Sequence, residues 1–155
     1  MNDYPTNMLD EVLESTSPEQ VKEYLDEYED ALVSGDHPFA DYFRRLLREK
    51  GMTKQSILAR AEFTDKVGYR LLSQERTTKQ RDYILRLCLA AQFTLKETQR
   101  ALKLYGMPEL YAKVPRDVVL IIALNQGVYD LGEVNEMLLA HGFERLRKPE
   151  ESKNV

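Results

Sequence analysis

Residues that start and stop α-helices recur along this chain at intervals of one short helix. The segment Ser17–Gln20 combines a serine cap, a proline in the first turn and a glutamine three residues after the cap, a pattern typical of a helix start. Further starts and stops stand at Thr53, Thr64, Thr94 with Glu97, Gly51 and Gly106. The 22 leucines also outnumber the 10 valines and 4 isoleucines, which favours helices over strands. The sequence therefore predicts an all-α protein.

Apolar spacing between these signals predicts about seven helices in a single lobe. Apolar residues fall on one helical stripe at Val21, Leu25, Tyr28 and Leu32. We therefore expect a helix over 17–35 that turns this stripe inward, and a shorter helix over 7–15. The other helices are expected over about 39–51, 53–61, 64–72, 79–91, 94–106 and, as a hairpin, within 107–146.

Residues 81–110 are repeated in 116–146 with a period of 35–36 residues. The matching pairs are Arg81-Asp82 with Arg116-Asp117, Leu85 with Leu120, Leu89 with Leu124, Thr94 with Asp130, Glu97 with Glu133, Leu102 with Leu138, Gly106 with Gly142 and Leu110 with Leu146. A period of this length is typical of helical hairpins, so we predict two hairpins packed side by side. Chance similarity between two amphipathic helix pairs is the alternative.

The segment Val118–Leu124 is apolar on every side of the helix that it is expected to form. An amphipathic surface helix has one apolar face only. This segment is therefore either the most buried helix of the protein or partly a dimer surface.

Charge is distributed unevenly along the chain. Residues 1–37 hold 11 acidic and 1 basic residue, residues 38–106 hold 7 acidic and 15 basic, and residues 107–155 hold 8 acidic and 6 basic. The net charges are therefore −10, +8 and −2, within a total of −4. We interpret these segments as an acidic N-terminal helical segment, a basic domain over 38–106, a C-terminal hairpin over 107–146 packed on it, and a flexible tail over 147–155. The basic block is expected to attract polyanions.

Scarce side chains exclude several classes of protein. The single cysteine, Cys88, rules out a disulfide framework and is expected to be a small core residue. The two histidines, His37 and His141, are expected in a loop and at a helix end. No nucleophile, acid–base or phosphate-loop motif can be assembled, so we predict no enzyme, no metal and no cofactor. The apolar runs are too short to span a membrane and no signal peptide is recognised, so we expect a cytoplasmic protein.

Five helix signals between Phe39 and Arg100 match a known spacing. They are Lys50-Gly51 ending a first helix, Met52–Gln55 opening a second, Thr64 opening a third, Arg81-Asp82 leading into a leucine-rich fourth, and Thr94–Glu97 opening a fifth. This stretch resembles the phage-repressor (Xre-type) helix-turn-helix family. The resemblance implies a repressor-like helical bundle, extended here by the C-terminal hairpin and the acidic N-terminal helix.

Three residues depart from the pattern of that family. Gln74 stands where a glycine is usual after the third helix, and Thr78 stands where a proline is common. Gly68 lies inside the third helix, where a larger apolar residue is normal. An inward glycine costs helix stability, but it would let the second and third helices approach closely.

The resemblance also implies that the third helix lies in the major groove of DNA. Its outward positions would be Thr64, Asp65, Lys66, Tyr69, Arg70 and Ser73, and its inward positions Val67, Leu71 and Leu72. Arg70 is the candidate for bidentate contact with a guanine. Lys54, Arg76 and Lys79 are the candidates for phosphate contacts.

We therefore expect a sequence-specific transcriptional regulator that binds double-stranded DNA through a helix-turn-helix, as a homodimer. The alternative is a helical protein–protein interaction adaptor with a degenerate helix-turn-helix. In that case the acidic N-terminal helix or the C-terminal hairpin would hold a protein partner. The acidic segment itself either docks on the basic domain in competition with DNA, or is the solvated face of a packing helix.

Overall fold

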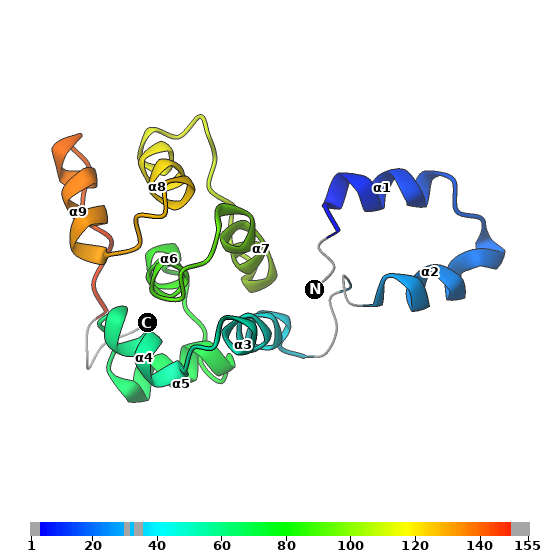
Figure 1. Ribbon diagram of the computed structural model, residues 1–155, viewed down its shortest axis with the longest axis horizontal. Helices are drawn as coiled ribbons and strands as arrows, with labels where there is room; N and C mark the ends of the chain where they lie inside the picture. The colour runs from blue at the N-terminus through cyan, green and yellow to red at the C-terminus, as the bar shows by residue number, and fades with distance from the viewer. Residues whose placement is uncertain (1–3, 30–31, 33–35, 150–155) are drawn as a thin grey trace. The chain divides into compact units, whose positions relative to one another are not determined.

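The computed structural model describes residues 4–29, 32 and 36–149, and among them it contains helices and irregular segments but no strand (Figure 1). The prediction of an all-α protein is confirmed. The contacts between residues divide the chain into two compact units, Met1–Asp36 and His37–Val155. The prediction of a single lobe is therefore wrong, and each unit is described by itself. Within the described segments, no helix has both the length and the apolar character needed to cross a membrane.

The first unit contains α1 (Thr6–Glu14), a short 3-10 helix (Pro18–Gln20) and α2 (Val21–Glu27). The N–H of Ser17 donates to the side chain of Gln20 at 2.9 Å, as the start signal predicts. The helix expected over 17–35 is wrong in length, because α2 ends at Glu27. No basic residue stands in its last turn, while Glu23 and Glu27 are like charges four residues apart. Both features weaken the C-terminal end of a helix.

Two of the four residues of the expected inward stripe in the first unit are exposed. Val21 and Leu25 on α2 are 54% and 47% exposed, and Leu13 on α1 is 48% exposed. Tyr28 is buried, and its ring packs against those of Tyr4 and Tyr24 with centroids 5.0 and 4.7 Å apart. The unit therefore keeps a small tyrosine cluster and leaves three large apolar side chains in contact with solvent.

The second unit begins with α3 (Pro38–Lys50), α4 (Lys54–Arg60) and α5 (Asp65–Ser73). It continues with α6 (Arg81–Ala90), α7 (Leu95–Tyr105), α8 (Pro115–Asn125) and α9 (Leu131–Ala140). The described part of the chain thus has nine α-helices, which lie in the segments named from the sequence, the hairpin counting as two, although the expected total was about seven.

One core joins the helices of the second unit. α3 packs on α5 and α7, and α4 packs on α5 and α6. Two aromatic rings of α3 make contacts at the two ends of α7. The ring centroid of Phe43 lies 4.8 Å from that of Phe93, which precedes α7, and the centroid of Phe39 lies 4.8 Å from that of Tyr105, edge-on. These aromatic contacts are specific in geometry as well as large in buried area.

Six helices of the second unit end in the same way. The N–H of an apolar residue beyond the helix donates to the carbonyl five residues earlier, in the pairs Met52–Leu47, Phe63–Leu58, Phe93–Cys88, Met107–Leu102, Val128–Ala123 and Phe143–Leu138. The preceding residue has a positive φ in each case, which defines a Schellman motif. Glycine takes that position in four of the six helices, while Glu62 and Gln92 take it in α4 and α6.

The repeat seen in the sequence is a structural repeat. Repeat 1 consists of α6, α7 and the segment to Leu110, and repeat 2 consists of α8, α9 and the segment to Leu146. In repeat 1 the Gln99 amide accepts from the Leu110 N–H at 2.7 Å. In repeat 2 Asn135 accepts from the Leu146 N–H at 2.9 Å. The same positions make the same contacts, so chance similarity is an inadequate explanation.

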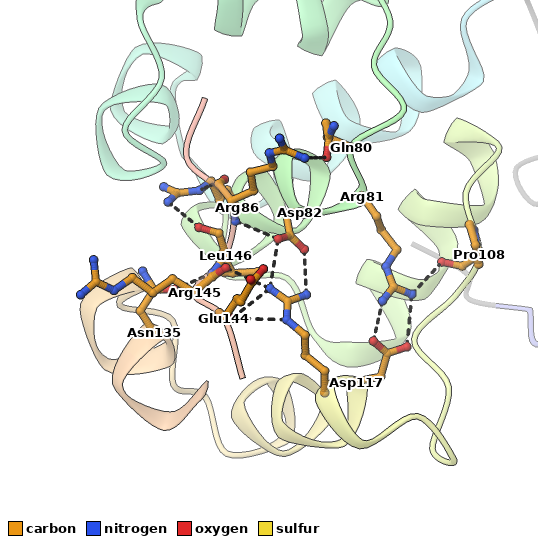
Figure 2. Close-up of polar contacts among 12 residues, drawn as sticks. Gln80, Arg81, Asp82, Arg86, Pro108, Asp117, Asn135, Glu144, Arg145 and Leu146 are labelled. Carbon is orange, nitrogen blue, oxygen red and sulfur yellow. Dashed lines mark hydrogen bonds and ion pairs between the residues drawn. The ribbon is translucent and has the colours of Figure 1, made fainter. Parts of the chain in front are cut away.

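The two repeats are joined by crossed ion pairs (Figure 2). Arg81 of repeat 1 makes a bidentate contact with Asp117 of repeat 2, at 2.5 and 3.2 Å. Arg116 of repeat 2 makes a bidentate contact with Asp82 of repeat 1, with both bonds at 3.0 Å. Each carboxylate lies in the first turn of its own helix, where the helix dipole also favours a negative charge.

The contacts around these pairs repeat as well. Arg81 donates to the carbonyls of 108–109 at the end of its own repeat, and Arg116 donates to those of 144–145. α6 packs on α9, and α7 packs on α8. Exchanging the two repeats reproduces this set of contacts, as a two-fold axis between them would.

A buried arginine attaches the end of repeat 2 to α4. Arg86 is 3% exposed and donates to the carbonyls of Ala61, Leu146 and Arg147 at 2.8–3.1 Å. Desolvation lowers the pKa of Arg86, and the nearby carboxylates of Glu62 and Asp82 oppose that change. Arg147, expected to begin a flexible tail, also donates its N–H to Asp82 at 2.8 Å. The rest of the predicted tail, from residue 150, lies outside the described residues.

We predict that Asp117→Ala lowers the free energy of unfolding by about 3–5 kcal/mol, because it leaves Arg81 partly buried without its carboxylate. The Arg81→Ala/Asp117→Ala double variant should lose less than the sum of the two single variants. Asp41→Ala is the matched control, because its pair with Arg44 is exposed on both sides and should contribute at most about 1 kcal/mol. Urea denaturation of the four variants measures these differences, and equal losses for Asp117→Ala and Asp41→Ala would contradict the prediction.

Candidate nucleic-acid interface

α4 and α5 are joined by a four-residue link, Ala61–Thr64, and pack against each other. The Thr53 side chain caps α4 by accepting the Ser56 N–H at 3.2 Å, as its sequence position predicts. Thr64 stands at the N-cap of α5 but makes no side-chain capping bond. Between the two helices Phe63 is buried, so the link is anchored in the core while Thr64 stays exposed.

Gly68 brings α5 close to α4. A Cβ atom at this position would lie 2.3 Å from one Leu58 methyl carbon and 2.9 Å from the other. Leu58 is fully buried and has little room to move. The close approach expected from an inward glycine is therefore present, and it explains why a larger residue is missing here.

Gln74 ends α5 in the left-handed conformation, with φ of 60°. A glycine adopts this conformation without steric cost, whereas a glutamine does not. Gln74 instead uses its side chain, whose oxygen accepts the Ala40 N–H at 3.0 Å. Ala40 lies in the first turn of α3, where backbone N–H groups have no partner within the helix. The glutamine therefore connects the end of α5 to the start of α3.

The segment 75–80 after α5 is held at several points. The Arg76 N–H donates to the Arg70 carbonyl at 3.2 Å. Thr78 is buried, and its N–H donates to the Tyr105 hydroxyl at 3.0 Å. Burial raises the pKa of Tyr105, and this hydrogen bond opposes the rise. Thr78 at a position where proline is common thus supplies an N–H that proline lacks, and Lys79 follows a fixed backbone.

The predicted inward and outward sides of α5 match its burial. Val67, Leu71 and Leu72 are buried. Exposed side chains are those of Thr64, Lys66, Tyr69, Arg76 and Lys79, and half-buried ones are those of Lys54, Arg70 and Ser73. The side chain of Asp65 lies outside the described residues.

Two groups of basic side chains in the second unit differ in their partners. Arg81, Arg116 and Arg86 bind carboxylates or carbonyls inside the protein, and Lys50 pairs with Glu97 at 3.1 Å. By contrast, the five predicted DNA-binding cations make no ion pair with any residue that the structure describes. These are Lys54, Lys66, Arg70, Arg76 and Lys79. They all lie on α4, α5 or the segment after α5, and we call them the α5 cations.

The Ser73 hydroxyl makes hydrogen bonds within the end of α5. It donates to the Arg70 carbonyl at 3.2 Å and accepts the Glu75 N–H at 3.3 Å. These bonds close the last turn of α5. The side chain therefore supports the helix end that carries Arg70, rather than pointing a free hydroxyl outward.

Sequence reasoning missed the supporting roles of two residues, Arg86 and Gln74. An arginine inside the apolar run 83–91 is the one signal that could have identified Arg86 as a buried contact. The weaker candidates behave as expected. Cys88 is buried, which raises the pKa of its thiol, while His37 precedes α3 and His141 follows α9.

The chain matches no protein-family model, no curated protein and no solved structure. A functional proposal therefore rests on the contacts, burial and charges of its own residues.

We predict that Gly68→Ala lowers stability by about 1–3 kcal/mol, since the new methyl group overpacks against Leu58. Helix propensity alone would give a gain of about 1 kcal/mol. In a Leu58→Ala background the same substitution should be neutral or stabilising, because the methyl group then fills vacated space. Thermal melts of the four proteins decide between the two effects, and a stabilising Gly68→Ala in the wild-type background would refute the close approach.

Glycine substitutions at Gln92 and Gln74 separate the cost of a left-handed backbone from the contribution of the Gln74 cap. Gln92→Gly should stabilise the protein by about 1 kcal/mol, because it removes a side chain from a left-handed position. Gln74→Gly should gain less or lose stability, because it also removes the bond to Ala40, a cap contribution of about 0.5–2 kcal/mol. Equal gains for both variants in denaturant titrations would show that the Gln74 cap contributes nothing.

Proposed function

We propose that this protein is a sequence-specific, DNA-binding transcriptional regulator that places α5 in the major groove. The observation that carries the proposal is the grouping of the α5 cations, which lack carboxylate partners among the described residues. Leaving five cations without partners on one pair of helices favours binding of a polyanion. By contrast, Arg81, Arg86, Arg116 and Lys50 of the same unit have partners inside the protein, so they would have to break those contacts to bind a polyanion.

The position of each α5 cation suggests its role. Arg70 is half-buried on α5, so its guanidinium emerges from a fixed stem and can contact a guanine through two hydrogen bonds. Lys54 at the start of α4 and Lys79 after α5 would contact phosphates and fix the position of the helix on the duplex. Lys66 and Tyr69 are exposed on the same helix and would lie near the base edges. The protein would act by binding alone, without a catalytic centre or cofactor.

A protein–protein interaction adaptor is the second candidate, and one observation favours it. The first unit exposes Leu13, Val21 and Leu25 among numerous carboxylates. An acidic helix with exposed leucines suits a basic partner with an apolar groove. This function needs α1 and α2 rather than α5, so substitutions on α5 distinguish the two candidates.

We expect Arg70→Ala to weaken binding to a selected DNA site by about 1–3 kcal/mol and to relax base preference at one position. Arg70→Lys should retain much of the general affinity but lose the preference, because an ammonium group lacks the planar fork of arginine. Lys79→Ala should weaken binding to all sequences equally and reduce the salt dependence by about one phosphate contact. Fluorescence anisotropy with a site selected from random duplexes measures all three effects.

Lys113→Ala is the matched control, because Lys113 is exposed, has no ion pair among the described residues and lies before α8. It should leave affinity unchanged. If no duplex is enriched in the selection, or if Lys113→Ala weakens binding as much as Arg70→Ala does, the proposed α5 surface is wrong.

A further inference from the structure

The approximate two-fold relation between the repeats shows which face of repeat 2 lacks a cover. In repeat 1, one face of α6 and α7 packs against α3, α4 and the link between α4 and α5. The rings of Tyr83 and Phe63 are 5.9 Å apart, and Arg86 donates to the Ala61 carbonyl. Leu87 lies one turn beyond Tyr83 on the same stripe of α6 and is 0% exposed.

The equivalent face of repeat 2 has no such cover among the described residues. Figure 1 shows α8 and α9 on the side of α6 away from α3, α4 and α5. The position of Leu87 is taken by Ile122, which is 49% exposed. The position of Tyr83 is taken by Val118, which is half-buried. Repeat 2 therefore keeps apolar side chains at positions where repeat 1 packs against the rest of its unit, and Ile122 is half exposed there.

The rest of α8 confirms that the repeats share their inner contacts. Leu120, Ala123 and Leu124 are buried, as are their counterparts Leu85, Cys88 and Leu89. Ile122, Asn125 and Gln126 are exposed, whereas their counterparts Leu87, Ala90 and Ala91 in repeat 1 are buried. The apolar segment Val118–Leu124 is therefore not buried on every side: one side of the helix lies in the core, and the other side is exposed. We call the residues Val118, Ile122, Asn125 and Gln126 the α8 face.

We propose that the α8 face binds the same face of a second copy of this chain. In a two-fold contact the same patch of both copies meets, so a face that carries charges of one sign would repel itself. The stretch 118–129, which includes the whole α8 face, contains no Asp, Glu, Lys or Arg. An apolar stripe with an uncharged amide rim at Asn125 and Gln126 is compatible with itself, whereas the acidic first unit offers this face no charge complementarity.

The contact between copies would replace the cover that α3 and α4 give to repeat 1. A helix packs its apolar stripe against another helix at an interaxial distance of about 8–10 Å, and the partner's α8 supplies such a stripe. Ile122 would then lie near the two-fold axis. This proposal does not depend on DNA binding, and it is tested without DNA.

Leu139 on α9 provides a matched control for Ile122. Leu139 is 48% exposed and Ile122 is 49% exposed, so the two side chains are nearly equal in exposure. The counterpart of Leu139 in repeat 1 is Lys103, which is exposed to solvent. Leu139 therefore occupies a position that the repeat leaves open to water, whereas Ile122 occupies one that the repeat covers.

The first test measures mass against concentration for the full chain by sedimentation equilibrium. Wild type and Leu139→Lys should form dimers, and Ile122→Lys should be monomeric at concentrations where the other two are dimeric. Thermal melts check that the lysine variants remain folded. A wild type that stays monomeric up to millimolar concentration, or equal dissociation of both lysine variants, would overturn the proposal.

The second test is disulfide cross-linking between copies, and its result does not depend on a variant that destabilises the dimer. Cys88 is the only cysteine and is buried, with the pKa of its thiol raised by burial, so it stays unreactive in the folded protein. Ile122→Cys should form an intermolecular disulfide in oxidising buffer, visible as a dimer on non-reducing gels, and Leu139→Cys should not. Cross-linking of Leu139→Cys but not of Ile122→Cys would place the contact elsewhere and overturn the proposal, even if Ile122→Lys had failed to fold.

Discussion

Two crossed arginine–aspartate contacts hold the second unit together as one body. Arg81 with Asp117 and Arg116 with Asp82 join the first turns of α6 and α8, which lie about 35 residues apart in the sequence. Because α8 is fixed there, the chain after α9 returns along α6, where Arg86 binds the carbonyls of 146–147 and that of Ala61. The C-terminal hairpin is thereby linked to the end of α4, next to the helix proposed to enter DNA.

The same contacts explain why the charge of the second unit is informative. A positive block in a sequence can be consumed by internal pairs, and here Arg81, Arg86 and Lys50 are consumed in that way. Buried or half-buried pairs of this kind are expensive to break, so these cations are unavailable to a ligand. The α5 cations remain without carboxylate partners among the described residues. They lie on α4, on α5 and on the segment after α5, and contacts of Gly68, Gln74 and Thr78 hold α5 and that segment in place. Framework and binding surface are thus separate sets of basic side chains.

Local signals in the sequence predicted the helices of the second unit well, because caps and stops act within a few residues. The Thr94/Glu97 capping box is present in the structure with bonds of 2.9 and 3.1 Å, and Gly51 and Gly106 end their helices. The pairing of Arg81 with Asp117 could not be predicted, since a repeat reveals equivalent positions but not their partners. The prediction that the apolar stripe of α2 is buried was inaccurate for a similar reason. Helical spacing shows that a helix has an apolar face, but not whether another element covers that face. The sequence alone did not show whether Ile122 is a core or a surface residue; the contrast with its buried counterpart Leu87 does.

The central claim is that the α5 cations contact DNA while the paired arginines serve as framework. NMR spectra of the arginine side-chain Nε–H groups test this claim directly when the full chain is titrated with a selected duplex. The signals of Arg70 and Arg76 should shift, together with the backbone amides of α5 and 75–80. Those of Arg81, Arg86 and Arg116 should stay in place, because their hydrogen bonds are internal. Shifts confined to the framework arginines or to the acidic first unit would contradict the account.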